Sequence, residues 1–149
     1  MWIAGFVSAE GCFLVNIKQS KTMLRVYSTT LRFQITQHIR DRFLLTNIVK
    51  FLDCGHLHEW DKVQFLDVIV NKLSHINDKI IPFFIKYPIL PPPEEGGPPL
   101  LWGGGGVKAL DFSDFIKVAD LMRDKGHLTS EGLDNILNIK SGMNKGRNN

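Results

Sequence analysis

Hydrophobic residues alternate with polar residues along two neighbouring segments near the start of the chain, residues 12–18 and residues 25–38. The apolar positions of these segments include Phe13, Val15, Ile17, Leu31, Phe33 and Ile35. A period of two is typical of a strand with one buried face. The two segments therefore predict an antiparallel hairpin with one apolar face and one polar, basic face, connected by the polar residues 19–24.

The spacing of apolar residues changes to that of a helix over residues 41–52. The core stripe expected for this helix consists of Phe43, Leu44, Ile48, Phe51 and Leu52. Apolar residues three and four apart lie on one side of a helix, so this stripe is expected to face the sheet.

A second strand pair is predicted at residues 55–60 and 63–70, joined by a tight turn at Asp61 and Lys62. A further helix is predicted over residues 74–85. Its inward side consists of Ile76, Ile80, Ile81 and Phe84. Pro82 lacks a backbone N–H and is expected to bend or interrupt this helix.

The order helix, strand pair, helix, strand pair, helix predicts an α+β domain of the form αββαββα. Its four strands would form one antiparallel sheet covered by helices on one face. Residues 1–88 would hold this core.

A different composition follows the core. Residues 89–106 are dominated by proline and glycine, which cannot build a packed core, and predict a disordered insertion. Residues 107–142 would resume the domain with two helices, one at 111–124 and one that starts at the N-cap Thr129 and runs to about 141. Residues 143–149 form a basic tail.

The composition of the 149-residue chain is that of an ordinary globular domain, with 44% hydrophobic and 22% charged residues. The formal net charge of +3 is compatible with nucleic acid but does not require it. The two cysteines, Cys12 and Cys54, are too few for a disulfide framework and lack zinc-site spacing, so both are expected to be reduced thiols. No signal-peptide pattern or membrane-spanning apolar run is present.

Residues 2–11 carry the most specific motif, WIAGFVSAEG. A short apolar helix with small residues on one side ends in Glu10 and Gly11, and a strand begins at once. The motif resembles that of the LAGLIDADG homing endonucleases, with residues 3–11 at its nine positions. It departs from the family pattern at Ser8, where the family often has Asp.

The resemblance implies roles for individual residues. Glu10, followed by Gly11, would bind the Mg²⁺ ion that assists phosphodiester hydrolysis. Two such helices would pack together through small and apolar residues, here Trp2, Ala4, Gly5, Ser8 and Ala9.

Two further residues have both structural and catalytic interpretations. Alternation places Gln37 on the core side, where a strand-end glutamine needs a partner, and the family commonly has a glutamine beside the metal-bound water. Lys86 follows a predicted helix, where a lysine can answer the helix dipole or stabilise a phosphate transition state. Lys108 is an alternative for the second role.

Polar side chains gather on the solvent face of the predicted sheet. They are Asn16, Lys18, Arg32, Gln34, Thr36, His56, His58, Asp67 and Asn71. A solvated sheet face is one interpretation. The mixture is nevertheless rich in groups that bind bases and phosphates, and a two-stranded ribbon fits the major groove of DNA. His56 and His58 could also chelate a metal, although base or phosphate contact and simple exposure are favoured over that.

The resemblance predicts a mitochondrial, intron-encoded enzyme that cuts both strands of a DNA target. Because one motif supplies one carboxylate, the chain would act as a homodimer or as half of a two-motif protein. Its start on the motif favours a C-terminal half. The alternatives are a maturase that binds group I intron RNA and an inactive remnant.

Overall fold

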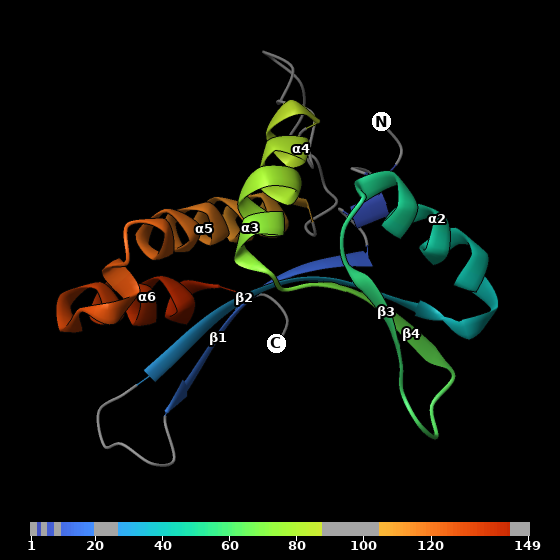
Figure 1. Ribbon diagram of the computed structural model, residues 1–149, viewed down its shortest axis with the longest axis horizontal. Coiled ribbons are helices and arrows are strands. Elements are labelled where there is room, and N and C mark those ends of the chain that lie inside the picture. The colour runs from blue at the N-terminus through green and yellow to red at the C-terminus, as the bar shows by residue number, and fades with distance from the viewer. Residues whose placement is uncertain (1–2, 4–5, 8–9, 20–26, 88–104, 144–149) are drawn as a thin grey trace.

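A computed structural model of the chain describes residues 3, 6–7, 10–19, 27–87 and 105–143. Four strands form one antiparallel sheet in the order β1-β2-β4-β3. Their bounds are β1 Gly11–Gln19, β2 Tyr27–His38, β3 His56–Glu59 and β4 Phe65–Val70. The labelled helices lie on one side of this sheet, and the β1–β2 and β3–β4 hairpins extend away from them on the other side (Figure 1). The predicted fold class is therefore confirmed.

The predicted alternation is confirmed on β1 and β2. Phe13, Phe33 and Ile35 are buried beneath the helices. The ring of Phe13 lies at the centre of an aromatic cluster, with centroid distances of 5.4 Å to Phe33, 5.2 Å to Phe115 and 5.8 Å to Phe84. This cluster joins two strands to the helices α4 (Ile81–Lys86) and α5 (Gly105–Arg123), so the core lies between the sheet and the helix layer.

A single 3-10 turn, Ile39–Asp41, leads from β2 into the helix α2, Arg42–Leu52. The helix was expected at this place, but the predicted stripe is wrong at Phe43 and Phe51, which are 80% and 53% exposed. The predicted Ile48 and Leu52 are buried, and Leu45, which was not part of the predicted stripe, is buried with them. Apolar residues occupy a wide arc of α2, and contact with the sheet selects the side that contains Leu45.

The next helical segment departs from α-helical geometry just before Pro82, the residue at which a bend or break was predicted. A short helix, α3 Leu73–His75, continues into a π-helical segment, η2 Ile76–Ile80, and then into α4. Pro82 stands at the start of α4, where its missing N–H is tolerated. All four residues predicted to face the core, Ile76, Ile80, Ile81 and Phe84, are buried.

Two helices close the described chain. The helix α5 begins at Gly105, inside the segment predicted as a disordered insertion, so that boundary is wrong by two residues; residues 88–104 lie outside the described part. After a 3-10 turn, Gly126–Leu128, the helix α6 runs over Ser130–Gly142. The predicted cap is confirmed, because the Gly132 amide donates to Thr129 Oγ1 at 3.0 Å.

The turn expected between β3 and β4 is present. It contains Asp61 and Lys62, and Lys62 has a positive φ of 71°. Of the two cysteines, Cys12 is half-buried and Cys54 is buried. None of the helices in the described part of the chain combines the length and the hydropathy that crossing a membrane requires.

Candidate nucleic-acid interface

The motif at the start of the chain ends at the edge strand of the sheet. Its described residues, Ile3, Phe6, Val7 and Glu10, have helical backbone. Ile3 and Val7, one turn apart, are buried in the core, and Phe6 packs against it. Glu10 is the last helical residue and is exposed. Packing of one helix side on the core therefore leaves the Glu10 carboxyl in solvent.

Gly11 makes this sharp exit possible. A β-carbon at Gly11 would lie 2.5 Å from Val7 Cγ1 and 2.9 Å from the Val7 carbonyl oxygen, closer than real contacts allow. Any other residue at position 11 would therefore force the junction between Glu10 and β1 to shift. The residues predicted to contact a second helix, Trp2, Ala4, Gly5, Ser8 and Ala9, lie outside the described residues.

Gln37 lies at the same end of the sheet. Gly11 pairs with Ile35 in the β1–β2 ladder, so β2 continues past the start of β1 through Gln37 to His38. Gln37 shares the face of Ile35, as alternation predicted, and is partly buried opposite Leu66. The fold thus brings Glu10 and Gln37 to one end of the β1–β2 pair.

Lys86 occupies the last turn of α4 and is exposed. Its ammonium nitrogen lies 5.3 Å from the centroid of the Tyr87 ring. Such a cation–π contact holds the side chain over an aromatic surface without removing its charge. The backbone of Lys108 belongs to α5.

The polar residues predicted on the solvent face do share one face of the sheet. Directly opposed residues of antiparallel strands project to the same side. The cross-strand pairs on this side are Asn16–Thr30, Lys18–Ser28, Leu14–Arg32, Cys12–Gln34, Thr36–Asp67, His58–Asp67 and His56–Ile69. Asn71 follows β4 directly and is exposed. No labelled helix covers this face (Figure 1).

Asp67 differs from its neighbours on this face, because it is only 2% exposed. One carboxylate oxygen accepts a hydrogen bond from Thr36 Oγ1 at 2.6 Å, and the other accepts one from Trp60 Nε1 at 2.6 Å. Asp67 therefore lies beneath the polar surface. The sequence had suggested that it was one of the exposed residues able to contact a nucleic acid.

Two other residues complete this network. Gln34 Nε2 donates to Thr36 Oγ1 at 3.2 Å. The ring of His58 meets the Trp60 ring edge to face, with centroids 4.6 Å apart. Trp60 was not among the predicted site residues. Its spacing of two residues from His58 and four from His56 was nevertheless a signal that it shares their face.

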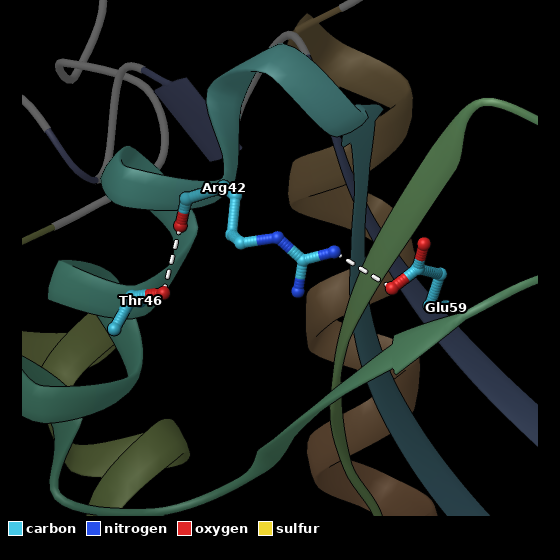
Figure 2. A network of polar contacts seen from close by, with 3 residues as sticks. All are labelled: Arg42, Thr46 and Glu59. Atoms are coloured by element: carbon cyan, nitrogen blue, oxygen red, sulfur yellow. Dashed lines mark hydrogen bonds and ion pairs between the residues drawn. The ribbon is translucent and has the colours of Figure 1, made fainter.

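A separate ion pair ties α2 to the edge strand of the sheet. Figure 2 shows Arg42 extending from the start of α2 to Glu59 on β3, with Nη2 and Oε2 2.7 Å apart. Thr46 Oγ1 donates to the Arg42 carbonyl at 2.8 Å, one turn along the helix. Both charged side chains are about half exposed, so the pair contributes little to the free energy of unfolding.

The acidic groups and histidines of the described residues do not build a metal site by themselves. In the part of the chain that the structure describes, no group of three or more His, Cys, Asp or Glu side chains could hold a metal ion. His56 and His58 are both exposed on β3. Glu10 could supply one carboxylate oxygen and Gly11 one carbonyl oxygen, both of which are donors that a hard cation such as Mg²⁺ prefers.

Comparisons with known proteins agree with this arrangement. The family model described as LAGLIDADG endonuclease matches residues 3–92. The chain is 33% identical over 142 residues to "Probable intron-encoded endonuclease 2" of Neurospora crassa. The matched region covers 95% of this chain and 26% of that protein. The chain belongs to the LAGLIDADG endonuclease family.

Solved structures of the endonuclease I-SmaMI have the same fold. The chain matches I-SmaMI bound to cleaved DNA with a TM-score of 0.84 and 39% identity, over 98% of this chain and 44% of I-SmaMI. It matches I-SmaMI bound to its uncleaved DNA target with calcium ions at a TM-score of 0.83 and 38% identity, over 97% of this chain and 44% of I-SmaMI. The chain thus spans about a quarter of its curated relative and less than half of this endonuclease.

Proposed function

We propose that this chain is one catalytic half of a site-specific homing endonuclease that hydrolyses both strands of double-stranded DNA. The observation that carries the proposal is the position of Glu10. Its exposed carboxyl stands at the end of the first helix, directly before β1, the strand that carries Asn16 and Lys18 of the polar sheet face. Such an enzyme needs a carboxylate that can bind a metal ion and groups that can bind phosphates, and this chain offers candidates for both.

The uncovered sheet face is the proposed DNA surface. Lys18 and Arg32 supply positive charge, and Asn16, Gln34, Thr36, His56, His58 and Asn71 supply hydrogen-bonding groups. The two hairpins extend on either side of this face, which suits a duplex lying along it (Figure 1). Much of the affinity would come from phosphate neutralisation and would fall as salt rises.

Glu10 and Gly11 are the proposed magnesium ligands. Their oxygens suit a hard cation, and the absence of a β-carbon at Gly11 lets the chain turn directly into β1. When bound, Mg²⁺ would activate water and neutralise charge that develops on the phosphate. Gln37, at the same end of the sheet, would orient the attacking water, and Lys86 would stabilise the phosphate charge.

One chain brings one Glu10, whereas cutting two strands requires two such groups. The proposed partner is a second copy of the chain or a second LAGLIDADG half, packed through Trp2, Ala4, Gly5, Ser8 and Ala9. The coverage of 44% of I-SmaMI supports this, since nearly half of that endonuclease corresponds to this chain.

A mitochondrial intron is the proposed location of the coding sequence. The supporting observation is the similarity to an intron-encoded endonuclease of Neurospora crassa.

The test is a cleavage assay on duplex DNA that spans the intronless junction of the host gene, with and without Mg²⁺. The chain would be assayed alone and as a tandem fusion of two copies. We expect metal-dependent cutting that Glu10→Gln abolishes and that Glu131→Gln, which changes an exposed acid on α6, leaves intact. Cutting that survives Glu10→Gln would contradict the proposal. Binding to the host intron RNA without any DNA cutting would favour the maturase alternative.

A further inference from the structure

We propose that buried Asp67 sets the hydrogen-bonding direction of Gln34 and thereby makes Gln34 select adenine at one position of the DNA target. The inference rests on the proposed function, because it assumes that the polar sheet face enters the major groove. Asp67 is a positioning residue in this proposal, and Gln34 is the group that touches the base.

Asp67 cannot itself contact a base. Only 2% of the residue is exposed, and its two carboxylate oxygens already accept hydrogen bonds from Thr36 and Trp60, both at 2.6 Å. The side chain nevertheless projects to the polar face, since Asp67 is paired with Thr36 on β2 and with His58 on β3. Two short hydrogen bonds hold this buried carboxylate in one orientation, so it can orient the polar groups that contact it.

The direction of each bond in the network follows from the chemistry of its members. A carboxylate only accepts hydrogen bonds, so the single hydroxyl hydrogen of Thr36 is donated to Asp67. The Thr36 oxygen can then only accept from Gln34. Gln34 must therefore turn its Nε2 group toward Thr36, and the 3.2 Å contact has this orientation.

The fixed amide leaves a defined pair of groups on Gln34. One N–H is donated to Thr36, and among the described residues no other hydrogen bond is made by the amide, so Oε1 and the second N–H are left for a base. An acceptor beside a donor matches the N6 amino group and N7 of adenine in the major groove. Guanine presents two acceptors there, O6 and N7, and O6 would face the Gln34 oxygen unfavourably.

The substitution Asp67→Asn should reverse the donor and acceptor roles in the hydrogen bonds of Thr36 with residue 67 and with Gln34. The Trp60 indole only donates, so the new amide must give its oxygen to Trp60 and its NH₂ group to Thr36. The Thr36 hydroxyl would then donate to Gln34 Oε1. The amide of Gln34 would turn over and present its N–H groups outward, which suits the two acceptors of guanine.

The experiment is selection of bound sequences from a randomised duplex library by the full chain, for the wild type and for Asp67→Asn. The wild type is expected to enrich adenine over guanine about tenfold at one position, within the range of one bidentate base contact. Asp67→Asn is expected to enrich guanine at that position and to leave the rest of the motif unchanged. A merely structural role of Asp67 would weaken all positions together and would not exchange one base for another.

Variants of exposed Thr36 keep the inference testable if Asp67→Asn does not fold. Thr36→Ser retains the hydroxyl and is expected to retain the adenine preference, whereas Thr36→Val removes it and should leave that position unselective. If Asp67→Asn and Thr36→Val both enriched the same motif as the wild type, the inference would be overturned and the proposed function would stay in place. A wild-type chain that enriches no sequence would overturn both.

Discussion

Val7 and Gly11 approach each other so closely that a β-carbon at position 11 would lie 2.5 Å from Val7 Cγ1. This contact lies between the end of the first helix and the start of β1. It determines where Glu10 stands, because the chain must change from helix to strand within one residue.

Gly11→Ala is therefore expected to lower the free energy of unfolding by about 1–3 kcal/mol, the usual range for an overpacked site. The Val7 backbone oxygen, 2.9 Å from the added carbon, cannot move away as a flexible side chain could. Urea denaturation measures the change. Gly142→Ala is the matched control, since a β-carbon there would meet no described atom within 4 Å apart from its chain neighbours and the backbone of its own helix. Equal stability of Gly11→Ala and the wild type would show that the junction relaxes.

Two residues of α2 should respond differently to truncation. Leu45 is fully buried, and Leu45→Ala should cost about 2–5 kcal/mol of unfolding free energy. Phe43 is 80% exposed, so Phe43→Ala should change stability by no more than about 0.5 kcal/mol. Thermal or urea unfolding of the two variants compares them directly. A larger loss for Phe43→Ala would mean that α2 packs in the phase that the sequence had suggested.

The pair formed by Asp53 and Lys79 should make stability depend on acid pH. Lys79 donates to the Asp53 carboxylate at 2.9 Å, and this hydrogen bond, with the attraction between the charges, lowers the pKa of Asp53. The folded protein then binds the proton less tightly than the unfolded chain does. The contribution is present above the ordinary carboxyl pKa of 3.8 and is lost as the pH falls through the lower folded-state value.

Asp53→Asn removes this titration, and asparagine tolerates the left-handed backbone at this position, where φ is 54°. The stability difference between wild type and variant should therefore shrink as the pH falls below the ordinary carboxyl pKa of 3.8 and through the lower folded-state value. Because the carboxyl is exposed, the difference should be small and should weaken in high salt. The difference in unfolding free energy between wild type and Lys79→Gln should shrink in acid in the same way. A difference that grows as the pH falls would contradict the assignment.

Removal of a charge from the polar sheet face should weaken DNA binding at every sequence. Lys18→Gln is expected to reduce the slope of log affinity against log salt by about one unit, because one phosphate contact is lost. Fluorescence anisotropy across a salt series measures the slope. Lys117→Gln is the control, since Lys117 is an exposed residue of α5 in the helix layer. Equal effects of the two substitutions would argue against binding through the sheet.

The faces of the sheet were predictable from the sequence. A shift of one residue in β2 would turn Phe33 and Ile35 out of the core and bring Arg32 and Gln34 into it, so the alternation permits only one assignment. The same reasoning placed Gln37 on the core side. The Thr129 cap and the turn at Asp61 and Lys62 were also predictable, because each depends on neighbouring residues alone.

Burial within each face required the tertiary structure. Alternation assigns Asp67 to the solvent side, but Thr36 comes from another strand and Trp60 from beyond the end of β3, and together they cover it. In α2, Phe43 and Leu45 are equally apolar, and only contact with the sheet decides which one is buried. Local patterns determine the direction in which a side chain projects, whereas its burial depends on residues distant in the sequence.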